Sequence, residues 1–184
     1  MTKRSQLPED EGLDALRDLF VAIMDLDDIT KATTEPFWRR RMALSRLYSF
    51  VTEPGAPEDP ELDRALEKDP ALRADFRRLL EKTAASYLPQ VAAASSGTIE
   101  RREGPGCRIR FEASRAEPSQ TYVIIELSDP ETPMPNALFV CYAEYRCVKF
   151  VLPPARDGVI QILLEQDSDL LAKLRDIKTE VFLR

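Results

Sequence analysis

The chain has 184 residues, a formal net charge of −6 and 43% apolar residues, which is typical of a globular protein with a core of its own. The acidic balance argues against binding to nucleic acid or to an anionic membrane surface. Histidine is absent, which excludes Ser-His-Asp and Cys-His catalysis and metal sites that need histidine.

Residues 1–94 show helical periodicity. Apolar residues recur at three- and four-residue steps in 11–24, which predicts a first helix. A second helix is expected over 34–52, where Thr34 can act as the N-cap. It should end before the proline-rich connector "EPGAPEDP".

Two Asp-Pro pairs predict the starts of a third and a fourth helix. In Asp59-Pro60 and Asp69-Pro70, the aspartate can cap the helix and the proline fits its first turn. The apolar stripe of the fourth helix extends to Tyr87, so this helix is expected to continue almost to the next proline.

Residues 95–184 change to a period of two, which indicates strands. "CRIRFEA", "TYVIIEL" and "VIQILLE" are each typical of a strand, and "KTEVFLR" is expected to form the last one. A short helix, "DLLAKLRDI", should precede that last strand. We interpret "NALFVCYAEYRCVKFVL" as one long strand with a bulge or bend near 144–146.

These elements predict the α+β class. Three to four amino-terminal helices would be followed by an antiparallel meander of five to six strands, with one short helix before the last strand. The helical region 1–94 and the sheet region 95–184 can form one compact domain.

The three cysteines are predicted to be reduced. In one extended strand, Cys141 and Cys147 would lie roughly 20 Å apart, too far for a disulfide. We interpret both as small core residues; a redox or nucleophilic thiol activated by Arg146 or Lys149 is the alternative. Reduced thiols, together with no apparent signal peptide, favour a cytoplasmic protein, and the composition suggests a bacterial source.

The second helix carries two apolar faces. Its core stripe is accompanied by a second face with Trp38, Met42 and Arg46, with Arg39 at its border. Tryptophan, methionine and arginine are enriched at protein interfaces. This face either packs on the protein's own sheet or binds a partner. Contact with nucleic acid is a third interpretation, which the net charge opposes.

A second candidate site lies on the predicted sheet. Tyr122 and Glu126 share one strand face, and Tyr142, Glu144 and Arg146 lie on or near another that can adjoin it. A glutamate held in such a pocket could act as a general acid or base. In the simpler interpretation, these polar residues lie in water at the sheet rim.

The sequence therefore favours a non-enzymatic protein that acts through protein–protein contacts, as a regulator, adaptor or complex subunit, with a protein partner or a second copy of the chain. The alternative is a small-molecule-binding protein or a simple acid–base enzyme. No cofactor or metal is expected, because the glycine pattern lacks a phosphate loop and no CxxC pair exists.

Overall fold

The computed structural model describes residues 37–57, 59–91, 99–128, 133–142 and 146–184, with side chains from residue 41 onward. The chain divides into two compact units, 1–41 and 42–184, and the second unit contains nearly all of the described structure. The helix predicted over 11–24 lies outside the described residues.

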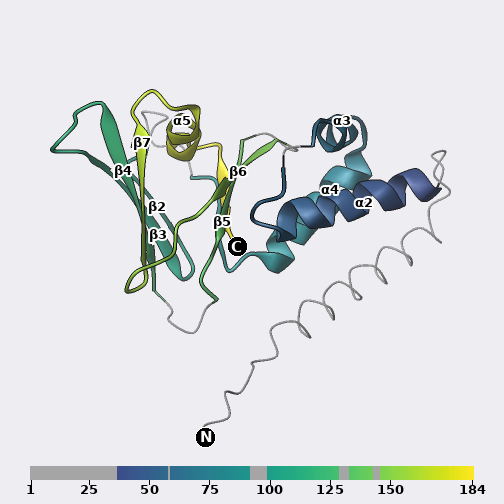
Figure 1. Cartoon of the computed structure of the whole chain (residues 1–184), viewed down its shortest axis with the longest axis horizontal. Helices are drawn as coiled ribbons and strands as arrows, with labels where there is room; N and C mark the ends of the chain where they lie inside the picture. The colour runs from purple at the N-terminus through teal and green to yellow at the C-terminus, as the bar shows by residue number, and fades with distance from the viewer. Residues whose placement is uncertain (1–36, 58, 92–98, 129–132, 143–145) are drawn as a thin grey trace, which may run out of the picture. The chain divides into compact units, whose positions relative to one another are not determined.

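Four helices are present in the described residues (Figure 1). They are α2 (Phe37–Thr52), α3 (Pro60–Lys68), α4 (Pro70–Thr83) and α5 (Asp169–Arg175). Both Asp-Pro predictions are confirmed, because Asp59 and Asp69 each accept hydrogen bonds from two backbone N–H groups of the following turn. The prediction for α4 was wrong at its end: the helix stops at Thr83, and Tyr87 lies in a strand.

In the same described ranges, eight strands form two antiparallel sheets of four. They are β1 (Ser86–Leu88), β2 (Arg101–Gly104), β3 (Cys107–Ala113), β4 (Gln120–Leu127), β5 (Ala137–Cys141), β6 (Cys147–Val151), β7 (Val159–Glu165) and β8 (Glu180–Leu183). The strand orders are β1-β8-β5-β6 in the first sheet and β2-β3-β4-β7 in the second. The α+β class is confirmed, but the strands divide between two sheets and do not form a single meander.

The main core lies between the two sheets. Alternate residues of β3, β4 and β7 and of β5 and β8 meet there, and α5 contributes Leu171 and Leu174. The first sheet is buried on both faces: all five residues of β5 are buried, and the opposite face contacts the helices. The Phe50 ring of α2 lies 5.9 Å from the Phe139 ring of β5 and 6.2 Å from the Phe76 ring of α4. The first sheet therefore lies between the second sheet and the α2–α4 layer (Figure 1).

The long strand predicted for "NALFVCYAEYRCVKFVL" was wrong. The chain reverses within it, so that β5 and β6 pair antiparallel and Cys141 lies opposite Cys147. The two cysteines form a disulfide with Cα atoms 4.0 Å apart, so the prediction of reduced thiols was wrong for this pair. Cys107 is the free cysteine, and it is buried in the core.

Within the described ranges, no helix combines the length and the apolar character needed to cross a lipid bilayer.

Candidate functional site

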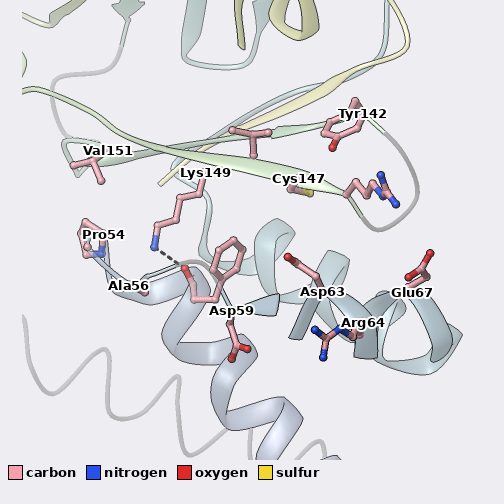
Figure 2. Close-up of a pocket in the computed structure, with 14 residues that line it drawn as sticks. Pro54, Ala56, Asp59, Asp63, Arg64, Glu67, Tyr142, Cys147, Lys149 and Val151 are labelled. Carbon is pink, nitrogen blue, oxygen red and sulfur yellow. Dashed lines mark hydrogen bonds between the residues drawn. The ribbon is translucent and has the colours of Figure 1, made fainter. Parts of the chain in front are cut away.

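A groove with a volume of about 530 Å³ runs between α3 and β6 (Figure 2). Figure 2 shows Cys147, Lys149 and Val151 along the strand on one side, with Asp63, Arg64 and Glu67 on the helix on the other. We call this space the β6 groove. It is lined by Phe50, Pro54, Gly55, Ala56, Asp59, Asp63, Arg64, Glu67, Tyr142, Arg146, Cys147, Val148, Lys149 and Val151.

The helical wall of the β6 groove is positioned by the cap and the buried face of α3. The Asp59 carboxylate accepts hydrogen bonds from the N–H groups of Glu61 and Leu62 at 3.0 and 3.1 Å, which fixes where the helix begins. Leu62 and Leu66 are each 3% exposed and anchor one face in the core. The charged side chains of the opposite face therefore line the groove, and they are Asp63, Arg64 and Glu67.

The other wall is an edge strand. The Tyr142 N–H donates to the Arg146 carbonyl at 3.0 Å, and the Leu152 N–H donates to the Asn136 carbonyl at 2.8 Å. Both bonds join even-numbered residues. Because hydrogen-bonded pairs alternate along an antiparallel ladder, the even-numbered residues of β6 are the ones whose backbone groups bond to β5. In the part of the chain that the structure describes, no strand pairs with the outer side of β6, and we call this side the open edge. The backbone N–H and C=O groups of the odd-numbered residues point to it, and these residues are Cys147, Lys149 and Val151.

Lys149 joins β6 to the end of α2. Its ammonium group donates to the Phe50 carbonyl at 2.6 Å and also to the Glu53 carbonyl, and it lies 5.3 Å from the centre of the Phe50 ring. Carbonyl groups at a helix carboxyl end lack partners within the helix and attract cations. Burial lowers the pKa of Lys149, and the nearby charge of Arg184 lowers it further. Lys149 therefore has a structural role, because it links β6 to the carboxyl end of α2.

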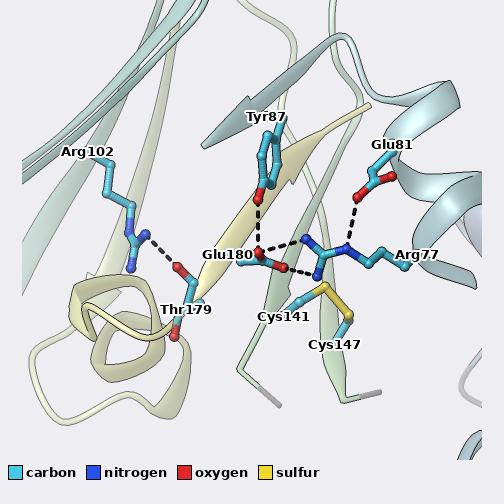
Figure 3. Close-up of polar contacts among 8 residues, drawn as sticks. All are labelled: Arg77, Glu81, Tyr87, Arg102, Cys141, Cys147, Thr179 and Glu180. Carbon is cyan, nitrogen blue, oxygen red and sulfur yellow. Dashed lines mark hydrogen bonds and ion pairs between the residues drawn. A yellow bond between two sulfur atoms is a disulfide. The ribbon is translucent and has the colours of Figure 1, made fainter. Parts of the chain in front are cut away.

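A second pocket of about 430 Å³ lies where α4 meets the first sheet, and its lining includes both disulfide cysteines and Arg77. The Arg77 guanidinium donates two hydrogen bonds to Glu180, at 2.7 and 2.9 Å, and one to Glu81 at 2.9 Å (Figure 3). Tyr87 donates to the same Glu180 carboxylate at 2.9 Å. Burial, followed by that hydrogen bond, raises the pKa of Tyr87. This cluster ties α4 to β8 and β1.

The second face of α2 is only partly described. The side chains of Trp38 and Arg39 lie outside the described residues. Met42 is 51% exposed. Arg46 pairs with Glu61 and lies 3.7 Å from Asp59, so it contacts the first turn of α3.

The residues predicted to share a ligand pocket lie in two places. Tyr142 and Arg146 line the β6 groove. Tyr122 and Glu126 belong to β4 in the other sheet, on the face opposite the core, where Glu126 accepts hydrogen bonds from Arg110 at 2.8 and 3.1 Å. Glu144 lies outside the described residues.

Three features of this region were missed from the sequence: the open edge at β6, the disulfide, and the bond from Lys149 to α2. One signal for the first two was available. The runs "ALFVC" and "CVKFV" are separated by "YAEYR", which has the length of a hairpin loop but none of the glycine, proline, asparagine or aspartate residues that are typical of turns. The Lys149 contact joins residues far apart in the chain, and no local pattern predicts it.

The chain matches no protein-family model, and comparisons with curated proteins and with solved structures found no similar protein.

Proposed function

We propose that this protein binds an extended segment of another protein, which adds as a strand to β6 in the β6 groove. The observation that carries the proposal is the coincidence of an open sheet edge with a groove of about 530 Å³ along it. Strand addition uses the backbone groups of an edge strand for affinity, and it uses pockets for alternate side chains to gain specificity.

The geometry of β6 suits this role. The outward N–H and C=O groups of Cys147, Lys149 and Val151 supply the ladder for an incoming strand. Side chains on one face of that strand would enter the space between β6 and α3. The groove has a volume within the usual range for a binding cleft.

The charges of the groove indicate the chemistry of the partner segment. Its lining holds three acidic and three basic side chains, which are Asp59, Asp63, Glu67, Arg64, Arg146 and Lys149. Because these charges balance, the groove does not favour a strongly charged partner. The apolar side chains Phe50, Pro54 and Val151 favour a segment with apolar residues at alternate positions.

The test begins with a library of random peptides displayed on phage and selected against the full chain. Selected peptides are then titrated by calorimetry against Val151→Pro. Val151 is 53% exposed, and proline at this position removes an outward N–H group without removing a bond to β5, so affinity should fall at least about tenfold.

Leu163→Pro is the matched control, because Leu163 is 45% exposed on β7, the edge strand of the other sheet, and its N–H group also points outward. This variant should bind normally, and circular dichroism should show that both variants are folded. Failure to select any peptide, or equal binding by Val151→Pro and wild type, would contradict the proposal.

A second surface for the same function is the outer face of α2, which is favoured by the 51% exposure of Met42. The double variant Trp38→Ala/Met42→Ala tests it. If this surface binds a partner, a protein that wild type captures from the native host should not be captured by the double variant. The helical signal in circular dichroism should be the same for both. A collapsed fold would show that Trp38 is a core residue and would remove this surface from consideration.

A further inference from the structure

The Cys141–Cys147 disulfide lies where the proposed binding edge begins. Cys141 is the last residue of β5, and Cys147 is the first residue of β6. They form a pair without backbone hydrogen bonds between them, the kind of cross-strand pair in which the side chains are closest. The disulfide therefore fixes one end of the edge strand to its neighbour.

The disulfide is accessible from two sides. Cys147 is partly exposed and lines both the β6 groove and the second pocket, whereas Cys141 is 8% exposed and lines the second pocket. Figure 3 shows the disulfide beside Arg77, which lines the same pocket. Arg77 is paired with Glu180, which lines the same pocket, so the feature that admits an attacking thiol is the partial exposure of Cys147.

We propose that Cys141–Cys147 is a thiol-exchange site whose state controls the order of β6, with low-molecular-weight thiols as the reductant. A thiolate attacks the Sγ atom of Cys147, forms a mixed disulfide and releases Cys141 as a thiolate, which takes a proton from water. A second thiol then attacks the reductant's sulfur in the mixed disulfide and releases Cys147. Two thiols are oxidised to one disulfide, and the protein disulfide is reduced to two thiols.

Opening the disulfide removes the covalent link between the start of β6 and β5 and leaves the backbone hydrogen bonds between the two strands. The far part of the strand keeps the bonds from Lys149 to α2. A less ordered edge is a poorer template for an incoming strand, because ordering it costs binding free energy. If the proposed strand addition is correct, on which this consequence rests, the reduced protein binds selected peptides about tenfold more weakly.

Thiol labelling of the full chain tests the exchange itself. The folded protein is incubated with glutathione and, in parallel, with dithiothreitol, and is then alkylated and weighed by mass spectrometry. Two labels should be added under native conditions, and a third, at the buried Cys107, should appear only after denaturant is added. A disulfide that resists both thiols until the protein unfolds would overturn the proposal.

Hydrogen exchange measured by mass spectrometry tests the effect on β6. Reduction should speed exchange about tenfold at the amide of Val148, which bonds to β5 next to the disulfide, and leave β3 and β4 unchanged. In Cys141→Ser/Cys147→Ser, exchange in β6 should equal that of the reduced protein and should not change when thiols are added. In Cys107→Ala, exchange in β6 should respond to thiols as it does in wild type. Unchanged exchange in β6 after reduction would overturn the proposal.

The peptide measurement separates the two proposals. Peptides that bind the oxidised protein about tenfold more tightly than the reduced protein support both. If the oxidised and the reduced protein bind the peptides equally well, the proposal that thiols control peptide binding is overturned. Absence of peptide binding in either form, together with thiol-dependent exchange in β6, removes the strand-addition function and supports the exchange site.

Discussion

Arg102 is the residue that departs most from what its local sequence indicates. It lies on β2 with 1% of its side chain exposed, and it donates hydrogen bonds to the carbonyl groups of Leu174 and Thr179, both at 2.7 Å, and of Asp176. Burial lowers its pKa to about 10, so the guanidinium is still charged at neutral pH. It binds carbonyl groups at the end of α5 and in the segment leading to β8 (Figure 3). An arginine with this arrangement acts as a clamp on the backbone.

Replacement of Arg102 by methionine should lower the free energy of unfolding by about 3 kcal/mol or more, because buried carbonyl groups would lose their donors. Urea denaturation measures this change. The control is Arg101→Met on the same strand, where the side chain is 72% exposed and the expected change is within about 0.5 kcal/mol. Similar losses in both variants would show that Arg102 is not a clamp.

Cys107 should make stability depend on pH in the alkaline range. Burial raises the pKa of its thiol to about 12, whereas an unfolded thiol ionises near about 8.5. Above the lower value the unfolded chain loses a proton that the folded chain keeps, so the free energy of unfolding falls as pH rises. The slope approaches about 1.4 kcal/mol per pH unit.

Chemical denaturation of wild type and of Cys107→Ala at several pH values from 8 to 9.5 measures how the free energy of unfolding changes with pH. The difference between the two slopes is the contribution of Cys107. The alanine variant starts from lower stability because of the lost packing, but its stability should vary less with pH. Parallel pH profiles for the two proteins would contradict this explanation.

At the scale of elements, local signals explain the helices better than the strands. The helix starts depend on Asp59, Asp69 and Ser168, whose side chains accept hydrogen bonds from nearby N–H groups, and such contacts need only neighbouring residues. The carboxyl end of α2 is different. It has no basic residue in its last turn, and it receives hydrogen bonds from Lys149 of β6 and from Arg184, which follows β8.

The disulfide should stabilise the β5–β6 hairpin modestly, because the chain segment that it closes is short. Cys141 and Cys147 are six residues apart, and for a loop of that size the entropic model gives about 2 kcal/mol. Chemical denaturation of Cys141→Ser/Cys147→Ser should show a loss of about this size, with a folded protein remaining. A loss near zero would show that the hairpin is fixed by its other contacts.

At the scale of the whole compact unit, 42–184, the first sheet joins two separate packing interfaces. One face belongs to the core between the sheets, and the other contacts the α2–α4 layer through Phe139. The Arg77–Glu180 pair spans the same interface with the helices. A sheet that is covered on both faces can be reached at its edges. The edge strand β6 therefore has backbone groups available to an incoming strand, whereas β5 is paired on both sides.

Phe139→Ala should therefore disturb the interface between sheet and helices and lower the free energy of unfolding by about 3 to 5 kcal/mol. Its ring is fully buried and contacts Phe50 edge-on. Leu163→Ala on the exposed face of the second sheet is the control, with a change below about 1 kcal/mol. Thermal and urea unfolding measure both. A small effect of Phe139→Ala would mean that the helices are held by polar contacts instead.

Local sequence patterns were enough to predict the α+β class, the starts of α3, α4 and α5, and the strands that alternate cleanly, such as β3 and β7, because caps and periodicity act between near neighbours. Such patterns did not predict how the strands divide between two sheets, the reversal of the chain between Cys141 and Cys147, or which strand lies at an edge. These features depend on contacts between segments far apart in the chain, and local patterns carry no information about which distant surfaces will meet.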